Sequence, residues 1–161
     1  MEIPQDKLAA MKKKAEAEYL HIGSVYCPYL DDNVHFSTEG FEHLLFRNKG
    51  RARRSAEQYT RLRLLPLAVE VIRKSHTLQE TDRQVIVVRQ KLGGKWNSSP
   101  RWTTFYVFIA LIRPNIRIKV IVREVDGGQK HFYSLFPSWK VSTGADGQRR
   151  KSFYSENPAD L

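Results

Sequence analysis

Cysteine and long apolar runs are both scarce in this chain of 161 residues. Cys27 is the single cysteine, which excludes an internal disulfide and a zinc site built on paired cysteines. We interpret Cys27 as a small buried hydrophobic residue. No apolar run approaches the roughly 20 residues that a membrane-spanning helix needs. The first residues also lack the apolar core of a signal peptide, so we expect a cytoplasmic protein that does not contact a membrane.

Motifs that hold metals or nucleotides are missing as well. The sequence contains no His-Glu-x-x-His motif and no cysteine pair. No glycine-rich loop leads from a strand into a helix, because Gly93-Gly94 is soon followed by Trp96 and Pro100. The sequence therefore predicts neither a metal nor a cofactor.

What the chain does have is an excess of positive charge, with 27 Lys and Arg, 17 Asp and Glu, and a formal net charge of +10. Residues 1–46 hold four Lys and eight Asp or Glu, a net −4. Residues 47–74 hold nine Lys or Arg and two Glu, a net +7, and residues 75–161 add another +7. Such a dense basic segment favours a polyanion as partner, most often nucleic acid, although it can also be a solvated surface that only aids solubility.

Helical periodicity dominates the first half of the chain. Apolar residues at three-to-four spacing predict a helix over 4–20, with Gly23 as its C-terminal cap. A second, shorter helix is predicted over about 38–47. Residues 51–74 are mostly helical in pattern, and Pro66 is expected to kink or split that helix.

From residue 76 the pattern changes to that of strands. Strands are predicted over residues 85–89, 101–112, 116–125 and 130–139. Residues 93–100 are expected to form a loop, and Asp126-Gly127 a hairpin turn. We therefore expect an α+β domain with the N-terminal helices packed on one face of a roughly four-stranded antiparallel sheet. Its parts would be an N-terminal helix (1–24), the α+β domain (25–141) and a weakly ordered polar tail (142–161).

The turn at Asp126-Gly127 also predicts which side chains of the last hairpin share a face. A two-residue turn places on the open face Arg117, Lys119, Arg123, Phe132, Ser134, Phe136 and Ser138. It places on the core face Val120, Val122, Tyr133 and Leu135, whereas an odd-length loop or a bulge would reverse the assignment. Cations neutralise phosphate and phenylalanines stack on unpaired bases, so this face suits RNA. The alternative is an ordinary polar face of an antiparallel sheet.

His43 is the strongest single candidate for a catalytic residue. Glu39 and Arg47 lie one helical turn before and after it, so the three side chains would share one flank of the second helix. An imidazole beside a carboxylate can act as a general base or acid near neutral pH. The alternative is a surface histidine in a salt-linked helix.

Three segments together carry a family resemblance. They are the run from His35 to His43 (His-Phe-Ser-Thr-Glu-Gly-Phe-Glu-His), the arginine-rich helix after it, and the strand Phe132-Tyr-Ser-Leu-Phe136. Over about residues 25–140 this layout resembles the barnase–EndoU–colicin–RelE-like RNase superfamily, most of all its phage- and prophage-associated members. The resemblance implies a metal-independent endoribonuclease, often a toxin. In such enzymes the RNA 2′-OH attacks the adjacent phosphorus and leaves a 2′,3′-cyclic phosphate.

The resemblance also implies roles for individual residues. His43 would be the acid or base, and Ser134 would hydrogen-bond the phosphate. The charged transition state would be stabilised by Lys119, Arg117 and Arg123. RNA would be bound by Arg47, Arg51, Arg53, Arg54, Phe132 and Phe136. The implied partners are RNA, such as tRNA or mRNA, and an antitoxin or immunity protein. Two alternatives remain, a non-catalytic RNA- or DNA-binding module and a mobile-element protein that binds an acidic partner.

Overall fold

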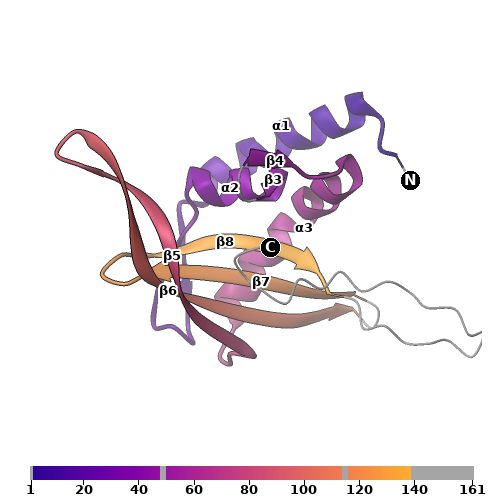
Figure 1. Ribbon diagram of the computed structural model, residues 1–161. Helices are drawn as coiled ribbons and strands as arrows, with labels where there is room; N and C mark the ends of the chain where they lie inside the picture. The colour runs from indigo at the N-terminus through magenta and orange to yellow at the C-terminus, as the bar shows by residue number, and fades with distance from the viewer. Residues whose placement is uncertain (1, 48–49, 114–115, 139–161) are drawn as a thin grey trace, which may run out of the picture.

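The computed structural model describes residues 2–47, 50–113 and 116–138, in which helices and a curved sheet form an α+β arrangement (Figure 1). The helices of this part of the chain are α1 (Gln5–Ile22), α2 (Thr38–Leu45) and α3 (Ser55–Lys74). All three were predicted from periodicity. Gly23 follows α1 with a positive φ of 65°, as expected of a glycine cap. Of the two outcomes expected at Pro66, a kink or a split, the split is wrong, because α3 runs through this residue as one helix.

The strands are β1 (Ser24–Cys27), β2 (Asp32–His35), β3 (Phe46–Arg47), β4 (Arg51–Ala52), β5 (Glu80–Leu92), β6 (Lys95–Arg113), β7 (Ile116–Val125) and β8 (Lys130–Pro137). Within the described residues, β3 and β4 pair only with each other, and the other strands form a six-stranded sheet in the order β1-β2-β8-β7-β6-β5. The prediction of a roughly four-stranded antiparallel sheet is therefore wrong in two respects, because the sheet has six strands and one of its pairs is parallel. The β1–β2 hairpin extends it at β8, and β2 lies parallel to β8.

The β2–β8 junction is short, with His35 opposite His131 and Val34 opposite Lys130. The ammonium group of Lys130 lies 3.0 Å from a carboxylate oxygen of Asp32 in β2 and 2.6 Å from one of Glu124 in β7. The half-buried Lys130 thus links three strands at the junction. Such a contact between residues about a hundred positions apart leaves no local pattern in the sequence.

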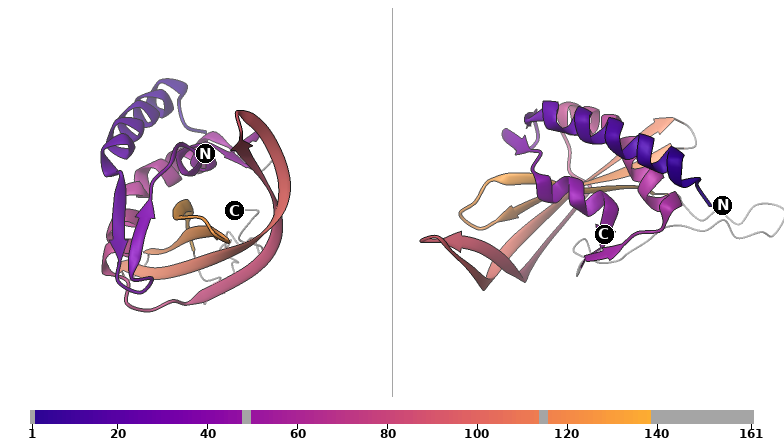
Figure 2. Two further views of the ribbon diagram at one scale, coloured as in Figure 1. Left: turned by 90° about the vertical axis from the view of Figure 1, so that its left-hand side faces the viewer. Right: turned by 90° about the horizontal axis from the view of Figure 1, so that it is seen from above.

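The expectation of a loop over residues 93–100 is wrong. Gly93 and Gly94 alone make the turn, with φ of 56° and 80°, a pair of left-handed residues typical of a two-residue hairpin. From Leu92 opposite Lys95, β5 and β6 stay paired as far as Glu80 opposite Val107. The hairpin forms one end of the curved sheet, and β1 and β2 form the other (Figure 2).

Part of the predicted face assignment is wrong, because the turn is longer than two residues and a β-bulge follows it. Glu124 is opposite Lys130, so five residues separate the paired ends instead of two, and this exchanges the faces of the residues just after the turn. Ile121 is opposite Ser134 but Val122 is opposite Phe132, so Tyr133 is the extra residue. Phe132 therefore lies in the core under the helices, stacked on Phe36 at a ring-centroid distance of 4.8 Å. Tyr133 lies on the other face instead of the core face. The alternation expected of a regular strand fails at this one position.

Both faces of the central strands are apolar and buried. The larger cluster joins α1, α2 and α3 to one face of the sheet, with Phe108, Val120 and Leu135 among its strand residues. The smaller cluster lies on the opposite face and consists of Phe105, Val107, Ile121, Tyr133 and Phe136. We call this second side of the sheet the inner face, because α2 and the start of α3 reach over it.

One expectation falls outside the described residues, namely the weakly ordered polar tail over 142–161. In the described ranges, no helix is both long enough and apolar enough to cross a membrane.

Candidate functional site

α2 is held against β8 by a close backbone approach at Gly40. A Cβ atom at this position would lie 2.5 Å from the carbonyl oxygen of Phe132 and 2.6 Å from the hydroxyl of Tyr19. Only glycine fits this space without a shift of one element. One turn later on the same helix, His43 is therefore placed directly over β8.

His43 lies on the inner face, against Tyr133. The two ring centroids are 4.2 Å apart with an interplanar angle of 32°, and His43 is 9% exposed. The guanidinium of Arg123 also lies over the ring of Tyr133, 5.0 Å from its centroid. Imidazole, phenol and guanidinium thus meet at one place, each from a different element.

The expected flank of Glu39, His43 and Arg47 is only partly present, because Glu39 and His43 lie one turn apart on α2 but Arg47 does not belong to this helix. α2 ends at Leu45, so Arg47 lies in β3 and its guanidinium is 3.2 Å from a carboxylate oxygen of Glu57. Glu39 forms an ion pair with Arg123 of β7 at 2.9 Å. The helix ends earlier than predicted, and tertiary partners replace the expected local ones.

The start of α3 carries an arginine cluster built around one carboxylate. Glu57 accepts from Arg47, from Arg53 at 2.8 Å and from Arg61 at 3.1 Å. The side chains of Arg53 and Arg61 are only 2% and 5% exposed. Three guanidinium groups share one carboxylate, so these four side chains carry a net charge of +2. We refer to Arg47, Arg53, Glu57 and Arg61 as the arginine cluster.

Burial and charge shift the pKa of every buried member of this cluster. Burial lowers the pKa of Arg61 to about 9, with the neighbouring Arg53 adding to the effect and Glu57 opposing it. Burial also lowers the pKa of Arg53. Burial alone would raise the pKa of Glu57, but the charges of Arg61 and Arg53 outweigh it and the pKa is lowered. An additional anion would relieve the repulsion between the two buried guanidinium groups.

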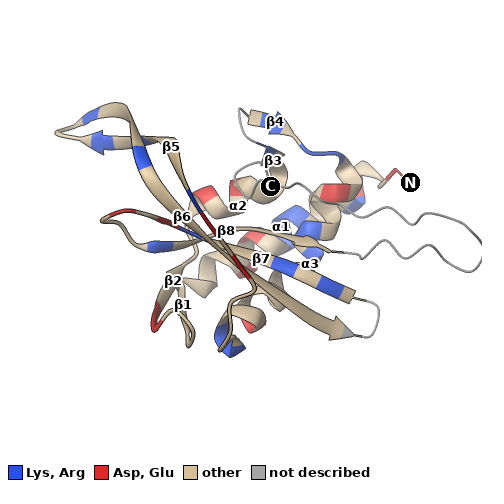
Figure 3. Cartoon of the chain, turned by 60° about the horizontal axis from the view of Figure 1, so that its bottom comes forward, with Lys and Arg blue, Asp and Glu red and all other residues tan. Residues whose placement is uncertain are grey.

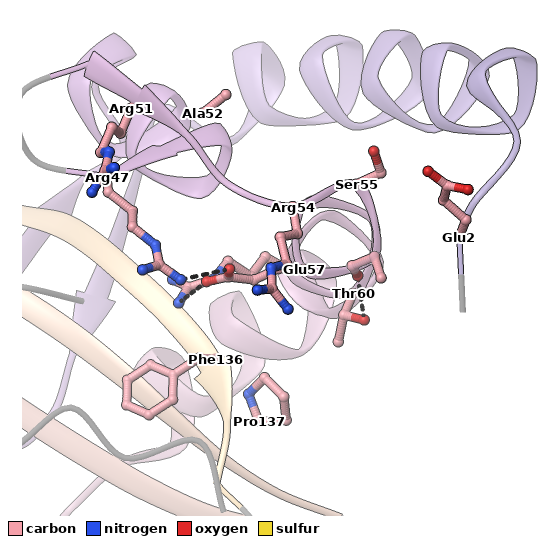
Figure 4. Close-up of a pocket in the computed structure, with 12 residues that line it drawn as sticks. Glu2, Arg47, Arg51, Ala52, Arg54, Ser55, Glu57, Thr60, Phe136 and Pro137 are labelled. Carbon is pink, nitrogen blue, oxygen red and sulfur yellow. Dashed lines mark hydrogen bonds and ion pairs between the residues drawn. The ribbon is translucent and has the colours of Figure 1, made fainter.

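A pocket of about 990 Å³ opens beside the arginine cluster, between β3–β4, α3 and the end of β8 (Figure 4). The charged residues of its wall are Glu2, Arg47, Arg51, Arg54, Glu57 and Arg61. Four arginines therefore face two carboxylates. Arg51 and Arg54 are exposed to solvent, and Phe136 and Pro137 form the apolar part of the wall. The geometry suits an anion with an apolar portion.

Arg53 and Arg61 connect the pocket to the inner face. Arg53 Nε donates to the carbonyl oxygen of His43 at 3.0 Å, which ties α2 to the cluster. Arg61 Nη1 donates to the hydroxyl of Ser134 at 2.8 Å, and its guanidinium lies 5.7 Å from the ring centroid of Phe136. Ser134 is fully buried, so in this arrangement it supports Arg61 rather than facing solvent.

Two of the three inner-face cations predicted from the hairpin, Lys119 and Arg123, have carboxylate neighbours. Lys119 is buried and donates to both oxygens of Glu80 in β5, at 3.1 and 3.3 Å. Arg123 pairs with Glu39, as described above, and Arg117 is half-buried on the same face. The face predicted to be open is therefore largely covered, since β5 curves over Lys119 and α2 reaches Arg123.

The six predicted RNA-binding residues divide by burial. Arg47, Arg51 and Arg54 are exposed and line the pocket. Arg53 is buried in the arginine cluster, and Phe136 is buried although it contributes to the pocket wall. Phe132 is enclosed by the core, so its predicted place on an open face is wrong.

Three residues of this region were not predicted as part of a site, namely Glu57, Arg61 and Tyr133. A signal for two of them is present in the sequence. Arg53, Glu57 and Arg61 are spaced by four residues each, the spacing at which charges of opposite sign meet on a helix. The face of Tyr133 was predicted wrongly, because the longer turn and the bulge at this residue both depart from the two-residue turn on which the assignment rested.

His131 and His35 form a second titratable group, where β2 meets β8. Their ring centroids are 5.8 Å apart. Burial lowers the pKa of His131, and the charges of His35 and Arg123 lower it further while Glu39 opposes them. Nothing places these two rings in the pocket.

Among the described residues, no three His, Cys, Asp or Glu side chains are grouped so that they could hold a metal ion. No protein-family model and no curated protein matches the sequence significantly, and no solved structure matches the fold significantly.

Proposed function

We propose that this protein is a metal-independent endoribonuclease that holds an RNA phosphate in the pocket beside the arginine cluster. The observation that carries the proposal is the excess charge there. Arg47, Arg53 and Arg61 share the single carboxylate of Glu57, and the exposed Arg51 and Arg54 add to the same pocket. Guanidinium groups match the oxygens of phosphate well, and RNA presents such groups in series.

The reaction that fits this proposal needs no group from outside the chain. The 2′-oxygen of RNA loses its proton and bonds to the adjacent phosphorus, the bond from phosphorus to the 5′-oxygen breaks, and that oxygen takes up a proton. A cyclic phosphate and a free 5′-OH result. Arginines fixed in place before the reaction stabilise the negative charge that builds on the phosphorane oxygens.

His43 is the residue we assign to proton transfer, with Tyr133 as its neighbour. An imidazole changes charge near neutral pH, which suits it to accept and return a proton. Arg53 connects the two parts of the site, since its guanidinium contacts both the backbone of His43 and Glu57. The superfamily resemblance favours the same assignment. On that resemblance, tRNA or mRNA in the cytoplasm would be the substrate, with a toxic effect that an antitoxin or immunity protein relieves.

A second candidate function is RNA binding without cleavage. It is favoured by the burial of His43 and Tyr133, which are 9% and 5% exposed. A proton-transfer group has to come within hydrogen-bond distance of the reacting atom, so cleavage requires α2 to shift when RNA binds.

The experiment that separates the two incubates total RNA with the purified protein in EDTA. The variants are Arg51→Ala, Arg54→Ala and His43→Asn, with Lys14→Ala on the exposed side of α1 as the matched control. Cleavage by the native protein and by Lys14→Ala, with a loss of at least about tenfold in each arginine variant, supports the endoribonuclease. Thermal unfolding shows which variants remain folded, and the exposed Arg51 and Arg54 keep the test valid if His43→Asn does not fold.

Binding that weakens in the arginine variants while the RNA stays intact would instead favour the non-catalytic module. Absence of both binding and cleavage would contradict either form of the proposal and favour an acidic protein partner. Toxicity on expression, relieved by the same substitutions, gives an independent measure of activity.

A further inference from the structure

The β5–β6 hairpin carries an exposed face that none of the helices in the described residues covers. Where the sheet lies under the helices, α3 packs on the face that includes Phe108 of β6. The other even-numbered residues of β6 continue this same face toward the Gly93-Gly94 turn. There the hairpin projects beyond the helices (Figure 1). The hairpin face, as we call it, includes Arg83, Val85, Val87, Arg89, Lys91, Trp96, Pro100 and Trp102.

Large apolar side chains on this face are open to solvent. Val87 is 73% exposed, Trp96 60% and Trp102 50%. The register places Val85 directly opposite Trp102 and Val87 opposite Pro100, so these side chains form one continuous strip. A strip of this kind on a protein surface marks an interaction site more often than it marks chance exposure.

Each tryptophan of the hairpin face has an arginine against its ring. The guanidinium carbon of Arg83 lies 4.7 Å from the ring centroid of Trp102, and that of Arg89 lies 4.9 Å from the centroid of Trp96. Arg83 also pairs with Asp126 of the β7–β8 turn. The cation–π contacts order side chains that would otherwise sample many rotamers, so less entropy is lost when a ligand binds.

The charge of this face is positive. Glu80 and Asp82 are the only acidic residues of β5, β6 has none, and both acids belong to the inner face. The register places Arg83, Arg89 and Lys91 on the hairpin face. Figure 3 shows the basic segments along this hairpin. Flat aromatic rings interleaved with cations are complementary to a chain of bases and phosphates. The guanidinium group against each ring favours a nucleic acid strand over an apolar protein surface.

We propose that the hairpin face binds single-stranded RNA, with unpaired bases stacked on Trp96 and Trp102 or on the guanidinium planes beside them. The choice of RNA rests on the proposed function. The two tryptophans are six residues apart on β6, which corresponds to about 20 Å at ~3.4 Å per residue. They therefore receive different bases of one strand, while the cations neutralise the phosphates between them.

The test uses an oligonucleotide of about 12 residues made of 2′-O-methyl RNA, a length within the range that such surfaces occupy. This RNA cannot be cleaved by 2′-OH attack, so binding is measured separately from chemistry. Trp96→Ala and Trp102→Ala are expected to weaken binding by about fivefold or more each, as loss of a stacking partner does. Trp96→Phe keeps an aromatic face and is expected to retain most of the affinity.

Leu111→Ala is the matched control, because Leu111 is an exposed apolar residue of β6 that belongs to the inner-face register. Native affinity in both Trp→Ala variants would overturn the inference. So would a native protein that self-associates in solution and becomes monomeric in these variants with its RNA affinity unchanged, since the face would then bind a second copy.

The outcome also separates this inference from the proposed function. If the Trp→Ala variants lose affinity but the native protein leaves ordinary RNA intact, RNA binding by the hairpin face is supported and the endoribonuclease proposal is contradicted. If RNA is cleaved in EDTA and the Trp→Ala variants bind as the native protein does, the endoribonuclease proposal is supported and RNA binding by the hairpin face is contradicted.

Discussion

The absence of a side chain at Gly40 allows α2 to lie close to the sheet. The carbonyl oxygen of Phe132 and the hydroxyl of Tyr19 both lie where a Cβ atom would be. That hydroxyl in turn donates to the carbonyl oxygen of Ser37 at 2.6 Å, just before α2 begins. Because α2 carries His43, the absence of a side chain at position 40 determines how close the imidazole comes to Tyr133.

Gly40→Ala should therefore destabilise the fold although alanine is the better helix former. Alanine in an open helix position would stabilise by roughly 0.5–1 kcal/mol, so the sign of the effect is informative. We expect a loss of about 1–3 kcal/mol in the free energy of unfolding, typical of an overpacked contact with backbone. Urea unfolding measures it, with the exposed Glu42→Ala of the same helix as control. Equal or greater stability in Gly40→Ala would show that α2 does not lie this close to β8.

His131 gives the fold a pH dependence of definite sign. Its pKa is lowered in the folded state from the usual 6.5, first by burial and then by the charges of His35 and Arg123, with Glu39 opposing. The unfolded chain therefore binds more protons than the folded one at this site, and stability rises with pH through this window.

Between about pH 5 and 7, the free energy of unfolding should increase with pH, and His131→Gln should flatten that increase. Urea unfolding at several pH values measures both, with His21→Gln on the exposed surface of α1 as control. An unchanged slope in His131→Gln, or a stability that falls as pH rises, would contradict the burial of this imidazole.

At the scale of elements, α3 performs two functions along its length. Its C-terminal two-thirds buries Leu65, Ala68 and Ile72 against the sheet. Its first turns instead carry Glu57 and Arg61, which hold the arginine cluster beside the pocket. A single helix thus anchors the fold at one end and concentrates positive charge at the other.

Glu57→Gln should show how much the arginine cluster depends on its carboxylate. Removing that charge leaves Arg53 and Arg61 buried side by side, and a loss of about 3–5 kcal/mol is typical when one partner of a buried ion pair is removed. Glu70→Gln is the control on the same helix, because its pair with Lys74 is exposed to solvent. Thermal or urea unfolding should therefore separate the two variants clearly, and equal stabilities would mean that the cluster is solvated rather than buried.

The sequence predicted elements whose signals are local. Strand β7 alternates apolar and charged residues and was predicted with its observed bounds, and helices α1 and α3 follow their apolar spacing. Residues 95–100 were not predicted as a strand because Asn97, Ser98 and Pro100 give them a loop-like composition. They are strand residues of the projecting hairpin and pack against no core.

Long-range geometry could not be predicted in the same way. The parallel contact of β2 with β8 depends on an approach between segments far apart in sequence, and the bulge at Tyr133 shifts one residue without any turn or glycine signal. The prediction of the candidate site was affected most, since Phe132 and Tyr133 each lie on the face opposite to the predicted one. The basic region itself was located correctly, because charge density can be read directly from the sequence.

At the scale of the whole molecule, the net charge of +10 is concentrated rather than diffuse. The first 46 residues are acidic, and the positive charge gathers at the pocket and along the β5–β6 hairpin (Figure 3). The proposed function therefore predicts RNA binding that depends steeply on salt, because each neutralised phosphate releases counterions.

Arg51→Ala and Arg54→Ala should each reduce the slope of log affinity against log salt by about 0.7, the value for one phosphate contact on a single strand. Lys14→Ala on α1 has the same loss of charge at a distance from the pocket and should leave the slope unchanged. Fluorescence anisotropy with a 2′-O-methyl RNA over a salt series measures all three. Equal slope changes in all three variants would mean that only net charge matters.

The central claim is that the arginine pocket and His43 act together to cut RNA, and the chemical end left on the product tests it most directly. The native protein and His43→Asn are incubated with a short RNA in EDTA, and the 3′ ends are identified by mass spectrometry. The account predicts a 2′,3′-cyclic phosphate with the native protein and intact RNA with a folded His43→Asn variant. Intact RNA with the native protein, or a cyclic phosphate formed equally well by His43→Asn, would contradict it.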